Sequence, residues 1–272
     1  MCASGISGTR GVVMTPPPVN LPVSSINRLM FKFSKGNDKL DNQTLIFNLP
    51  AGTTCPGANI CLSMVRIDQD GNRKIWDGPH TEFRCFAASS EVQYTKVYEA
   101  RQHNLKLVRQ HLAEGNLAGE LNNSLQNNLT KSITKVRIHE SGDFFSAEYL
   151  MAWLLVAYAN PAIKFYCYSK NLPLFVDIML PHNFYFTASY GGKYDHMIDE
   201  GLFPRYAKVF MTEADAIAEG FKVDVKDRSC FEDGPFALLV HGTQPKGSEW
   251  GKAARANRKV QKAKVRGAVV TI

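Results

Sequence analysis

The order of short apolar runs along the chain limits the possible folds more than any other feature. Runs rich in β-branched and aromatic residues alternate with stretches of helical periodicity, and strand followed by helix recurs at least five times. Strands that are separated by helices pair in parallel through right-handed crossovers. The pattern therefore indicates an α/β fold, either a parallel (β/α) barrel or partial barrel or an open doubly wound sheet. The expected strands are Leu29–Phe33, Leu45–Leu49, Val136–His139, Lys164–Tyr168, Phe184–Ala188, Lys208–Thr212, Lys222–Val225 and Phe236–His241.

The segments between these strands carry helix signals. Glu91–Leu112 has apolar residues at helical spacing, and Ala147–Ala159 follows Ser146, a good N-cap residue. Ala214–Glu219 follows a threonine that is also an acceptable N-cap. In contrast, Asn116–Lys131 is rich in asparagine and is interpreted as a polar connection on the surface.

Length and composition favour one domain. The chain has 272 residues, of which 44% are apolar, and this is enough for one large α/β domain with a buried core. Residues 1–28 contain Pro16–Pro17–Pro18 and are expected to form an extended N-terminal arm. Residues 29–272 are expected to form the α/β domain, which ends in a basic helix over residues 246–266.

The beginning of the chain lacks the apolar segment of a secretory signal, and about 18 consecutive apolar residues occur nowhere. We therefore expect a cytoplasmic protein without membrane association. Structural disulfides are not expected in a reducing cytoplasm.

The positive charge is confined to the C-terminus. The net charge is +7, yet Lys246–Ile272 holds eight basic residues and one acidic residue, which leaves 24 of each sign elsewhere. A local contact with a polyanion such as nucleic acid is one interpretation, and a solvated helix face is the other. The candidate contact residues are Lys252, Arg255, Arg258, Lys259 and Lys262.

Three cysteines follow the strand expected at Leu45–Leu49. Cys55, Cys61 and Cys85 carry thiolates that suit a soft metal or an iron–sulfur cluster, and such a site is the most specific chemistry in the chain. Their spacing fits no standard zinc signature, although zinc is the alternative metal. The other interpretation is that they are ordinary buried thiols. Cys167 lies in an apolar run and is expected in the core, whereas Cys230 is a candidate for a fourth ligand.

Parallel α/β folds place their chemistry at the carboxyl ends of strands. The strand expected at Val136–His139 runs into a compact loop before a helix. We interpret this loop either as a ligand site or as a helix-capping loop. Its candidate catalytic residues are His139, Glu140 and Asp143, and its candidate ligand-binding residues are Ser141 and Gly142.

The strand expected at Phe236–His241 leads into a second loop, which opens the basic helix. Two of its glycines have P-loop spacing, but the Gly-Lys-Ser/Thr element is absent. The loop is interpreted either as a backbone cradle for phosphate or carboxylate or as a structural turn. The candidate ligand-binding residues are Gly242, Thr243, Gln244, Gly247 and Ser248, and His241 is a candidate catalytic residue.

Five segments are distinctive in combination: Leu49–Ala58, Phe83–Ala88, Val136–Ser146, Phe165–Lys170 and His241–Pro245. Together they resemble the gene-product-88 family of bacteriophage proteins over about residues 29 to 260. The resemblance implies a phage origin, hence the cytoplasm of an infected bacterial host, and it assigns no chemistry.

The three cysteines are also similar, more distantly, to those of radical S-adenosylmethionine enzymes, in which cysteines after the first barrel strand bind a 4Fe-4S cluster. That resemblance implies that Cys55, Cys61 and Cys85 are the cluster ligands. It also implies that Ser141–Gly142–Asp143 stands where a Gly-Gly-Glu-like loop holds the methionine amine. The cysteines of those enzymes are closely spaced, whereas here Leu62–Glu82 has to loop out and bring Cys85 back.

Three functions follow as hypotheses. The first is a cytoplasmic phage iron–sulfur or other metal protein, with radical S-adenosylmethionine chemistry as its most specific form. The second is a nucleic-acid-binding or virion-associated protein that uses the basic helix, with structural cysteines. The third is a metal-independent hydrolase built from His139, Glu140, Asp143 and His241. The sequence names neither a substrate nor an oligomeric state.

Overall fold

The computed structural model describes residues 29–36 and 40–265. The expected N-terminal arm, residues 1–28, lies outside the described residues, as do residues 266–272. The side chains of residues 261–265 are likewise outside the description, although their backbone belongs to the last helix.

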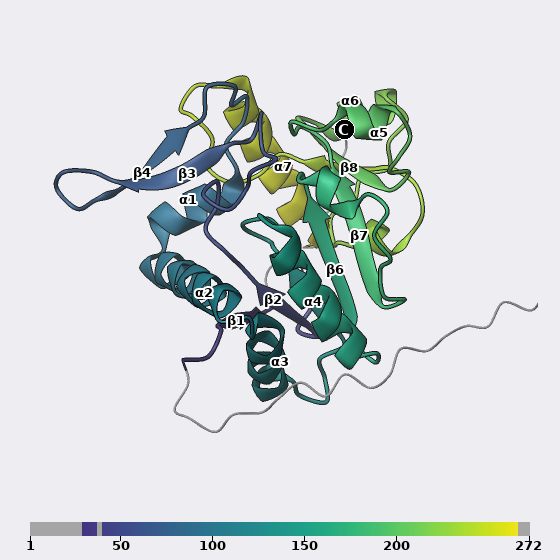
Figure 1. Ribbon diagram of the computed structural model, residues 1–272. Helices are drawn as coiled ribbons and strands as arrows, with labels where there is room; N and C mark the ends of the chain where they lie inside the picture. The colour runs from purple at the N-terminus through teal and green to yellow at the C-terminus, as the bar shows by residue number, and fades with distance from the viewer. Residues whose placement is uncertain (1–28, 37–39, 266–272) are drawn as a thin grey trace, which may run out of the picture.

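A seven-stranded sheet forms the centre of the protein (Figure 1). Its strand order is β1-β2-β5-β6-β7-β8-β9, and all neighbours pair in parallel except β1, which is antiparallel to β2. The α/β fold expected from the alternating pattern is therefore present. The strands are β1 (Phe33–Lys35), β2 (Thr44–Phe47), β5 (Lys135–Ile138), β6 (Lys164–Ser169), β7 (Phe184–Ser189), β8 (Tyr206–Phe210) and β9 (Phe236–Leu239).

The sheet is open. From β2 to β9 each parallel strand is added beside the one before it in the chain, which is the order found in the wall of a (β/α) barrel. In the described part of the chain, however, β1 and β9 are the two ends of this order, so no closed barrel is seen. The central structure is a mixed α/β fold with a mostly parallel sheet.

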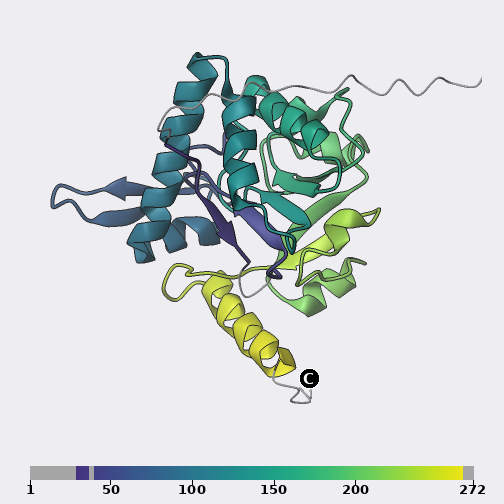
Figure 2. The ribbon, with the colours of Figure 1, turned by 90° about the horizontal axis from the view of Figure 1, so that it is seen from below.

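Three long helices cover one face of the sheet. They are α2 (Thr95–Ala113), α3 (Leu117–Asn128) and α4 (Ala147–Ala159), and they gather on one side of the molecule (Figure 2). The largest core cluster joins them to alternate residues of the strands, such as Val136 and Ile138 of β5. Because side chains alternate across a strand, Arg137 between them faces the opposite side of the sheet, where it contacts the ring of Tyr168.

Helix capping follows the sequence closely. The hydroxyl of Ser146 accepts a hydrogen bond from the backbone N–H of Tyr149 and begins α4, as predicted. Thr212 and Asp215 form a capping box at the start of α6. The remaining helices are α1 (Phe86–Gln93), α5 (His196–Asp199), α6 (Glu213–Ala218) and α7 (Glu249–Val265), and the 3-10 helices are η1 (Leu172–Phe175) and η2 (Ser229–Phe231).

Two predictions about helices were wrong. The helix expected over Glu91–Leu112 is broken at Tyr94, whose extended backbone separates α1 from α2. The polar connection expected over Asn116–Lys131 is helix α3. Its asparagines lie on the outer side, while Leu117, Leu121 and Leu125, four residues apart, are buried in the core.

Two predictions about strands also need correction, and one hairpin was not predicted. The strand expected at Leu29–Phe33 begins only at Phe33 and continues to Lys35 as β1. Lys222–Val225 forms no strand and contributes an isolated bridge between Val223 and Ala237. The segment after Cys61 contains a two-stranded antiparallel sheet that the sequence pattern had not indicated. This hairpin, β3 (Ser63–Ile67) and β4 (Arg73–Asp77), projects from the body beside α1 (Figure 1).

None of the described helices combines the length and the apolar character that a bilayer-spanning helix requires.

Candidate functional site

A pocket of about 180 Å³ lies at the carboxyl ends of the parallel strands. We call it the cysteine pocket, because all three clustered cysteines line it. They are joined there by residues from the loops after β5, β6, β7 and β9. The candidate site residues that line the pocket are Cys55, Cys61, Cys85, His139, Glu140, Ser141, Gly142, Asp143 and His241.

The three thiols reach the pocket from different turns of the chain. Cys55 and Cys61 belong to residues 50–62, which we call the cysteine loop, and Cys85 is the N-cap of α1. All three are partly buried, and burial raises the pKa of each thiol, to about 11 for Cys85. Cys85 and Cys61 also raise the pKa of Cys55, and Cys61 raises that of Cys85, so the three sulfurs are electrostatic neighbours.

Backbone donors point toward these sulfurs. Hydrogen bonds from the backbone N–H groups of Ala87 and Ala88, at the start of α1, oppose the rise in the pKa of Cys85. Gly52 donates in the same way to Cys55. Such hydrogen bonds stabilise a thiolate and adjust the potential of thiolate-bound clusters.

The cysteine loop is fastened to the strand ends through its backbone. The N–H of Ile60 donates to the carbonyl of Gly191 (3.3 Å), and the N–H of Lys193 donates to the carbonyl of Gly57 (2.9 Å). A Cβ on Gly57 would lie 2.2 Å from the carbonyl oxygen of Lys170, so no larger residue fits there. Gly192, after β7, also packs closely, since a Cβ there would lie 2.8 Å from the carbonyl oxygen of Gly57.

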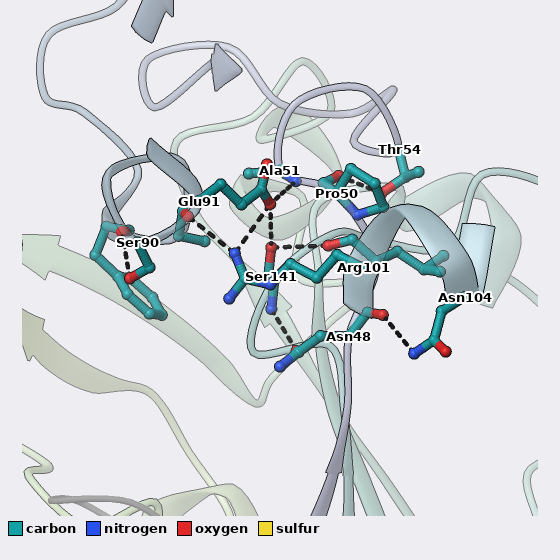
Figure 3. A network of polar contacts seen from close by, with 12 residues as sticks. Asn48, Pro50, Ala51, Thr54, Ser90, Glu91, Arg101, Asn104 and Ser141 are labelled. Atoms are coloured by element: carbon teal, nitrogen blue, oxygen red, sulfur yellow. Dashed lines mark hydrogen bonds and ion pairs between the residues drawn. The ribbon is translucent and has the colours of Figure 1, made fainter. Parts of the chain in front are cut away.

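A buried ion pair supports both ends of residues 51–85, which we call the cysteine segment because all three clustered cysteines lie in it (Figure 3). Glu91 of α1 and Arg101 of α2 lie 2.9 Å apart, and their side chains are 1% and 7% exposed. The same Glu91 oxygen accepts a hydrogen bond from the N–H of Ala51, and Arg101 donates to the carbonyl of Ala87. Burial raises the pKa of Glu91, and Arg101 opposes this shift. The pair thus links the start of the cysteine loop to the helix that begins at Cys85.

The loop after β5 is held by its own polar side chains. The hydroxyl of Ser141 donates to the carbonyl of Leu49 (2.8 Å), and its N–H donates to Asn48 (2.9 Å), as Figure 3 shows in part. Gly142 has φ of +85°, and a Cβ there would lie 2.7 Å from the Cβ of Leu49. Only glycine adopts this conformation at such close range.

Asp143 is buried and joins two strand ends. Its carboxylate accepts hydrogen bonds from the backbone N–H of Phe144 (2.7 Å) and of Lys170 (2.9 Å). Burial raises its pKa to about 6, although these bonds and the Ser169 hydroxyl favour the anion. The arrangement matches the capping-loop interpretation of this residue.

His139 is also buried, at 3% exposure, and has φ of +66°. Its Nε2 lies 2.8 Å from the hydroxyl of Tyr149. Burial and, to a smaller extent, the positive charge of Arg137 lower the pKa of His139 to about 3, so the imidazole is neutral. The neighbouring Glu140 lines both the cysteine pocket and an adjoining groove.

The comparisons with known proteins give one match. No curated protein and no solved structure matches the chain, so no comparison supports the likeness to radical S-adenosylmethionine enzymes. The model of the Gene product 88 family matches residues 31–263, most of the chain. The chain belongs to the Gene product 88 family. This family is of phage type, and the match includes every residue that lines the cysteine pocket.

In this member of the Gene product 88 family, residues 241–248 form what we call the clamp loop. The side chain of Gln244 accepts a hydrogen bond from the N–H of Arg84 (2.7 Å) and donates to the carbonyl of Arg84 (2.9 Å). The carbonyl of Thr243 accepts from Ser89, and the hydroxyl of Ser248 accepts from the N–H of Gly251 at the start of α7.

The clamp loop therefore fastens α1 and caps α7, as a structural turn does. Apart from His241, the candidate residues of this loop do not contribute to the described lining of the cysteine pocket. Gly242 has φ of +77° and packs directly on Phe86, where a Cβ would lie 2.6 Å from the Cβ of that residue. The expected phosphate cradle at Gly242, Thr243, Gln244, Gly247 and Ser248 is thus placed away from the pocket.

The basic helix expected near the C-terminus is α7. Its buried side includes Ala254 and Asn257, and the Asn257 amide donates to the carbonyl of Met211 (2.8 Å). Its basic side chains face solvent at Lys252, Arg255, Arg258 and Lys259, whereas the side chain of Lys262 lies outside the described residues.

Residues 29–36 and 40–265 contain no arrangement of side chains that would bind a single metal ion. No three Cys, His, Asp or Glu side chains among them converge closely enough to hold one ion. The zinc alternative therefore has no support in the geometry. Cys230 lies apart, buried beside Tyr166, and its thiol donates to the carbonyl of Asp227, and Cys167 is in the main core.

Two pocket residues were missed from the sequence. Lys170, after β6, lines the cysteine pocket and donates through Nζ to the hydroxyl of Ser189 (2.8 Å). Burial raises the pKa of Cys61, and the charge of Lys170 opposes this rise. Arg137 lines the floor of the pocket and pairs with Asp227. A basic residue directly after a β-rich run is the signal that marks Lys170, whereas Arg137 lies within a strand and carries no such signal.

Proposed function

We propose that this protein is a phage iron–sulfur protein of the host cytoplasm. In this proposal Cys55, Cys61 and Cys85 ligate a 4Fe-4S cluster in the cysteine pocket. One observation carries it: the three thiols line a single pocket although 23 residues, including the β3–β4 hairpin, separate Cys61 from Cys85.

The chemistry of the three thiols suits such a group. Burial raises the pKa of each thiol, and neighbouring thiols raise it further for Cys55 and Cys85, so three thiolate anions would repel one another in the pocket. Cys55, Cys61 and Cys85 would hold the iron as thiolates, and the positive charge of the iron would offset their repulsion. In a cluster each thiolate binds a different iron, so the sulfurs surround the cluster and need not converge on one ion.

A cluster with three protein ligands leaves one iron for a ligand from the pocket, and it supplies electrons or a Lewis-acid centre. The protein's part is to hold the thiolates and exclude water. The ion pair of Glu91 with Arg101 and the clamp of Gln244 on Arg84 fix the two ends of the cysteine segment. Rigid support of this kind is what a preorganised cluster site requires.

Fewer residues of the pocket suit S-adenosylmethionine than suit the cluster. The side chains of Ser141 and Asp143 already bond to the protein, so they are not available to hold an amine in the manner the resemblance implied. Glu140 lines the pocket beside them, and its carboxylate has the charge that an ammonium group requires. We keep S-adenosylmethionine as the co-substrate to be tested first.

The test is iron and sulfide analysis of anaerobically purified and reconstituted protein, with an ultraviolet–visible spectrum. We expect about four irons per chain and a broad shoulder near roughly 400 nm. Cys55→Ser, Cys61→Ser and Cys85→Ser should each lose most of the iron. Cys230→Ala, which removes a buried thiol away from the pocket, is the matched control and should keep it. A colourless wild-type protein without iron would overturn the proposal.

The co-substrate is tested separately on the loaded protein. After reduction, S-adenosylmethionine should yield methionine and 5′-deoxyadenosine if it binds the open iron. Glu140→Gln should lower this yield without lowering iron content. Loaded protein that leaves S-adenosylmethionine intact would remove this form of the proposal and keep the cluster.

A second candidate is nucleic-acid binding through α7. The favouring observation is that Arg255, Arg258 and Lys259 are exposed, and in the described part of the chain no ion pair joins them to an acidic residue. The triple variant Arg255→Glu, Arg258→Glu, Lys259→Glu should abolish salt-dependent binding of DNA or RNA. Binding that survives in this variant would reject α7 as the contact.

A further inference from the structure

A groove of about 630 Å³ adjoins the cysteine pocket, and we call it the α2 groove. One wall is a single face of α2. The residues of that wall follow helical spacing, since each lies three or four positions from another member of the set. The opposite wall comes from β1, β2 and the strand-end loops. The wall residues from α2 are Lys96, Val97, Ala100, Arg101 and Asn104.

The charges in this groove favour an anion. Lys32 and Lys96 line it and are exposed. Arg101 is 5% exposed and lines it from α2; its Nη1 pairs with Glu91, and its Nε has no hydrogen-bond partner among the described residues. The first turn of α2 has neither a side-chain cap nor an acidic residue, so its positive end is not neutralised. Within the described lining, Glu140 is the one carboxylate.

The groove also offers aromatic surface. Tyr94 lines it at the break between α1 and α2 and is 53% exposed, so its ring is accessible to a ligand. Phe33 and Phe86 line it from β1 and α1. Exposed aromatic rings beside cations are the features with which proteins hold a base and its phosphate.

The α2 groove and the cysteine pocket meet. Phe86, Glu140 and His241 line both, and the ring of His241 stacks near that of Phe86 at 4.4 Å between centroids. Glu140 thus lies at the junction, and the end of the groove nearest the cysteines carries a carboxylate and an imidazole. A ligand with its anionic part toward the lysines would present an uncharged part to this junction.

We propose that the α2 groove binds a nucleotide unit, with its phosphate between Lys32 and Lys96 and its base against Tyr94. Binding of the nucleotide does not depend on the proposed function. The idea that the bound nucleotide is the substrate of the cysteine pocket rests on that proposed function. A free nucleotide and a single nucleic-acid strand share this chemistry. The sugar or base then faces Glu140 and His241, next to the position proposed for the cluster.

The test is direct binding to the purified full chain, by fluorescence anisotropy for a labelled single-stranded oligonucleotide and by calorimetry for a mononucleotide. Lys32→Glu, Lys96→Glu and Tyr94→Ala should each weaken binding by about tenfold or more. The matched control is Lys106→Glu, an exposed lysine of α2 outside the groove, which should bind as the wild type does.

The outcomes separate the possible sources. Loss of mononucleotide binding in the groove variants supports a free nucleotide, and loss confined to the oligonucleotide supports a strand. If neither probe binds, or if Lys32→Glu and Lys96→Glu bind no worse than Lys106→Glu, the inference is overturned. Iron content tells this failure from that of the proposed function: the groove variants should keep their iron, and Cys55→Ser should lose iron and still bind the nucleotide.

Discussion

The cysteine loop and the clamp loop lie close together and differ in what their polar groups do. In the clamp loop, Gln244 and Ser248 give their hydrogen bonds to the protein itself. In the cysteine loop the backbone is fastened by hydrogen bonds, but the thiols of Cys55 and Cys61 face a pocket with raised pKa values. Polar groups that bond within the protein stabilise the fold, whereas groups that are held beside a cavity are available to a ligand.

The largest expected effect breaks the support beneath the cysteine loop. Glu91→Ala leaves Arg101 as a buried charge without its partner and should lower the free energy of unfolding by about 3 to 5 kcal/mol. Because Ala51 loses its acceptor too, iron content should also fall. Urea denaturation and metal analysis measure both. Glu99→Ala, an exposed carboxylate on α2, is the control, and equal stability of the two variants would contradict the role of the pair.

The next effect concerns pH. The pKa of Asp143 is raised to about 6 in the folded protein, above the unfolded value of 3.8, so the folded state holds the proton more tightly. Stability is therefore highest below about pH 4 with respect to this group and falls as the pH rises to about 6. The change is on the order of 3 kcal/mol. Asp143→Asn should remove this slope in urea denaturation between pH 4 and 6. An unchanged slope would assign the pH dependence to other groups.

The clamp loop gives a smaller effect. Gln244→Ala leaves the backbone N–H and carbonyl of Arg84 without partners and should cost about 2 kcal/mol. Because Arg84 directly precedes Cys85, this variant tests whether the clamp loop supports the cysteine site only indirectly. We expect a small loss of iron, far less than in Cys85→Ser, by metal analysis of the folded fraction. Complete loss of iron would mean that the clamp loop belongs to the site itself.

The smallest effect lies at the far end of the clamp loop. Ser248→Ala removes the N-cap of α7 and should lower stability by about 1 kcal/mol. Iron content should not change, since Ser248 does not line the cysteine pocket. Thermal unfolding and metal analysis check both statements. A loss of iron from this variant would contradict the separation of the two loops.

Part of this structure follows from local patterns. Alternating β-rich runs predicted β2, β5, β6, β7, β8 and β9, with small differences at the ends, because buried parallel strands need continuous apolar residues. Ser146 predicted the start of α4 because an N-cap acts within one turn. Helix α3 was missed, since its asparagines concealed the leucines at every fourth position.

The candidate site was predictable only in its parts. The cysteines and the loop after β5 were chosen from residue type and from their place after strands, and the structure brings them to one pocket. The roles of Asp143 and Gln244 were not predictable, because their partners Lys170 and Arg84 are distant in the sequence. The α2 groove had no signal, since its walls come from β1, α2 and the strand-end loops.

The sequence by itself determined the class of fold, the basic C-terminal helix and the family, because apolar periodicity, charge and motif act locally along the chain. Tertiary structure decided that the described sheet is open, since that depends on whether β1 and β9 pair. It also decided that Cys85 returns to Cys55 and Cys61, and that the clamp loop serves the fold. The physical reason is the same in each case: these outcomes depend on contacts between segments far apart in the chain, and residue order does not specify them.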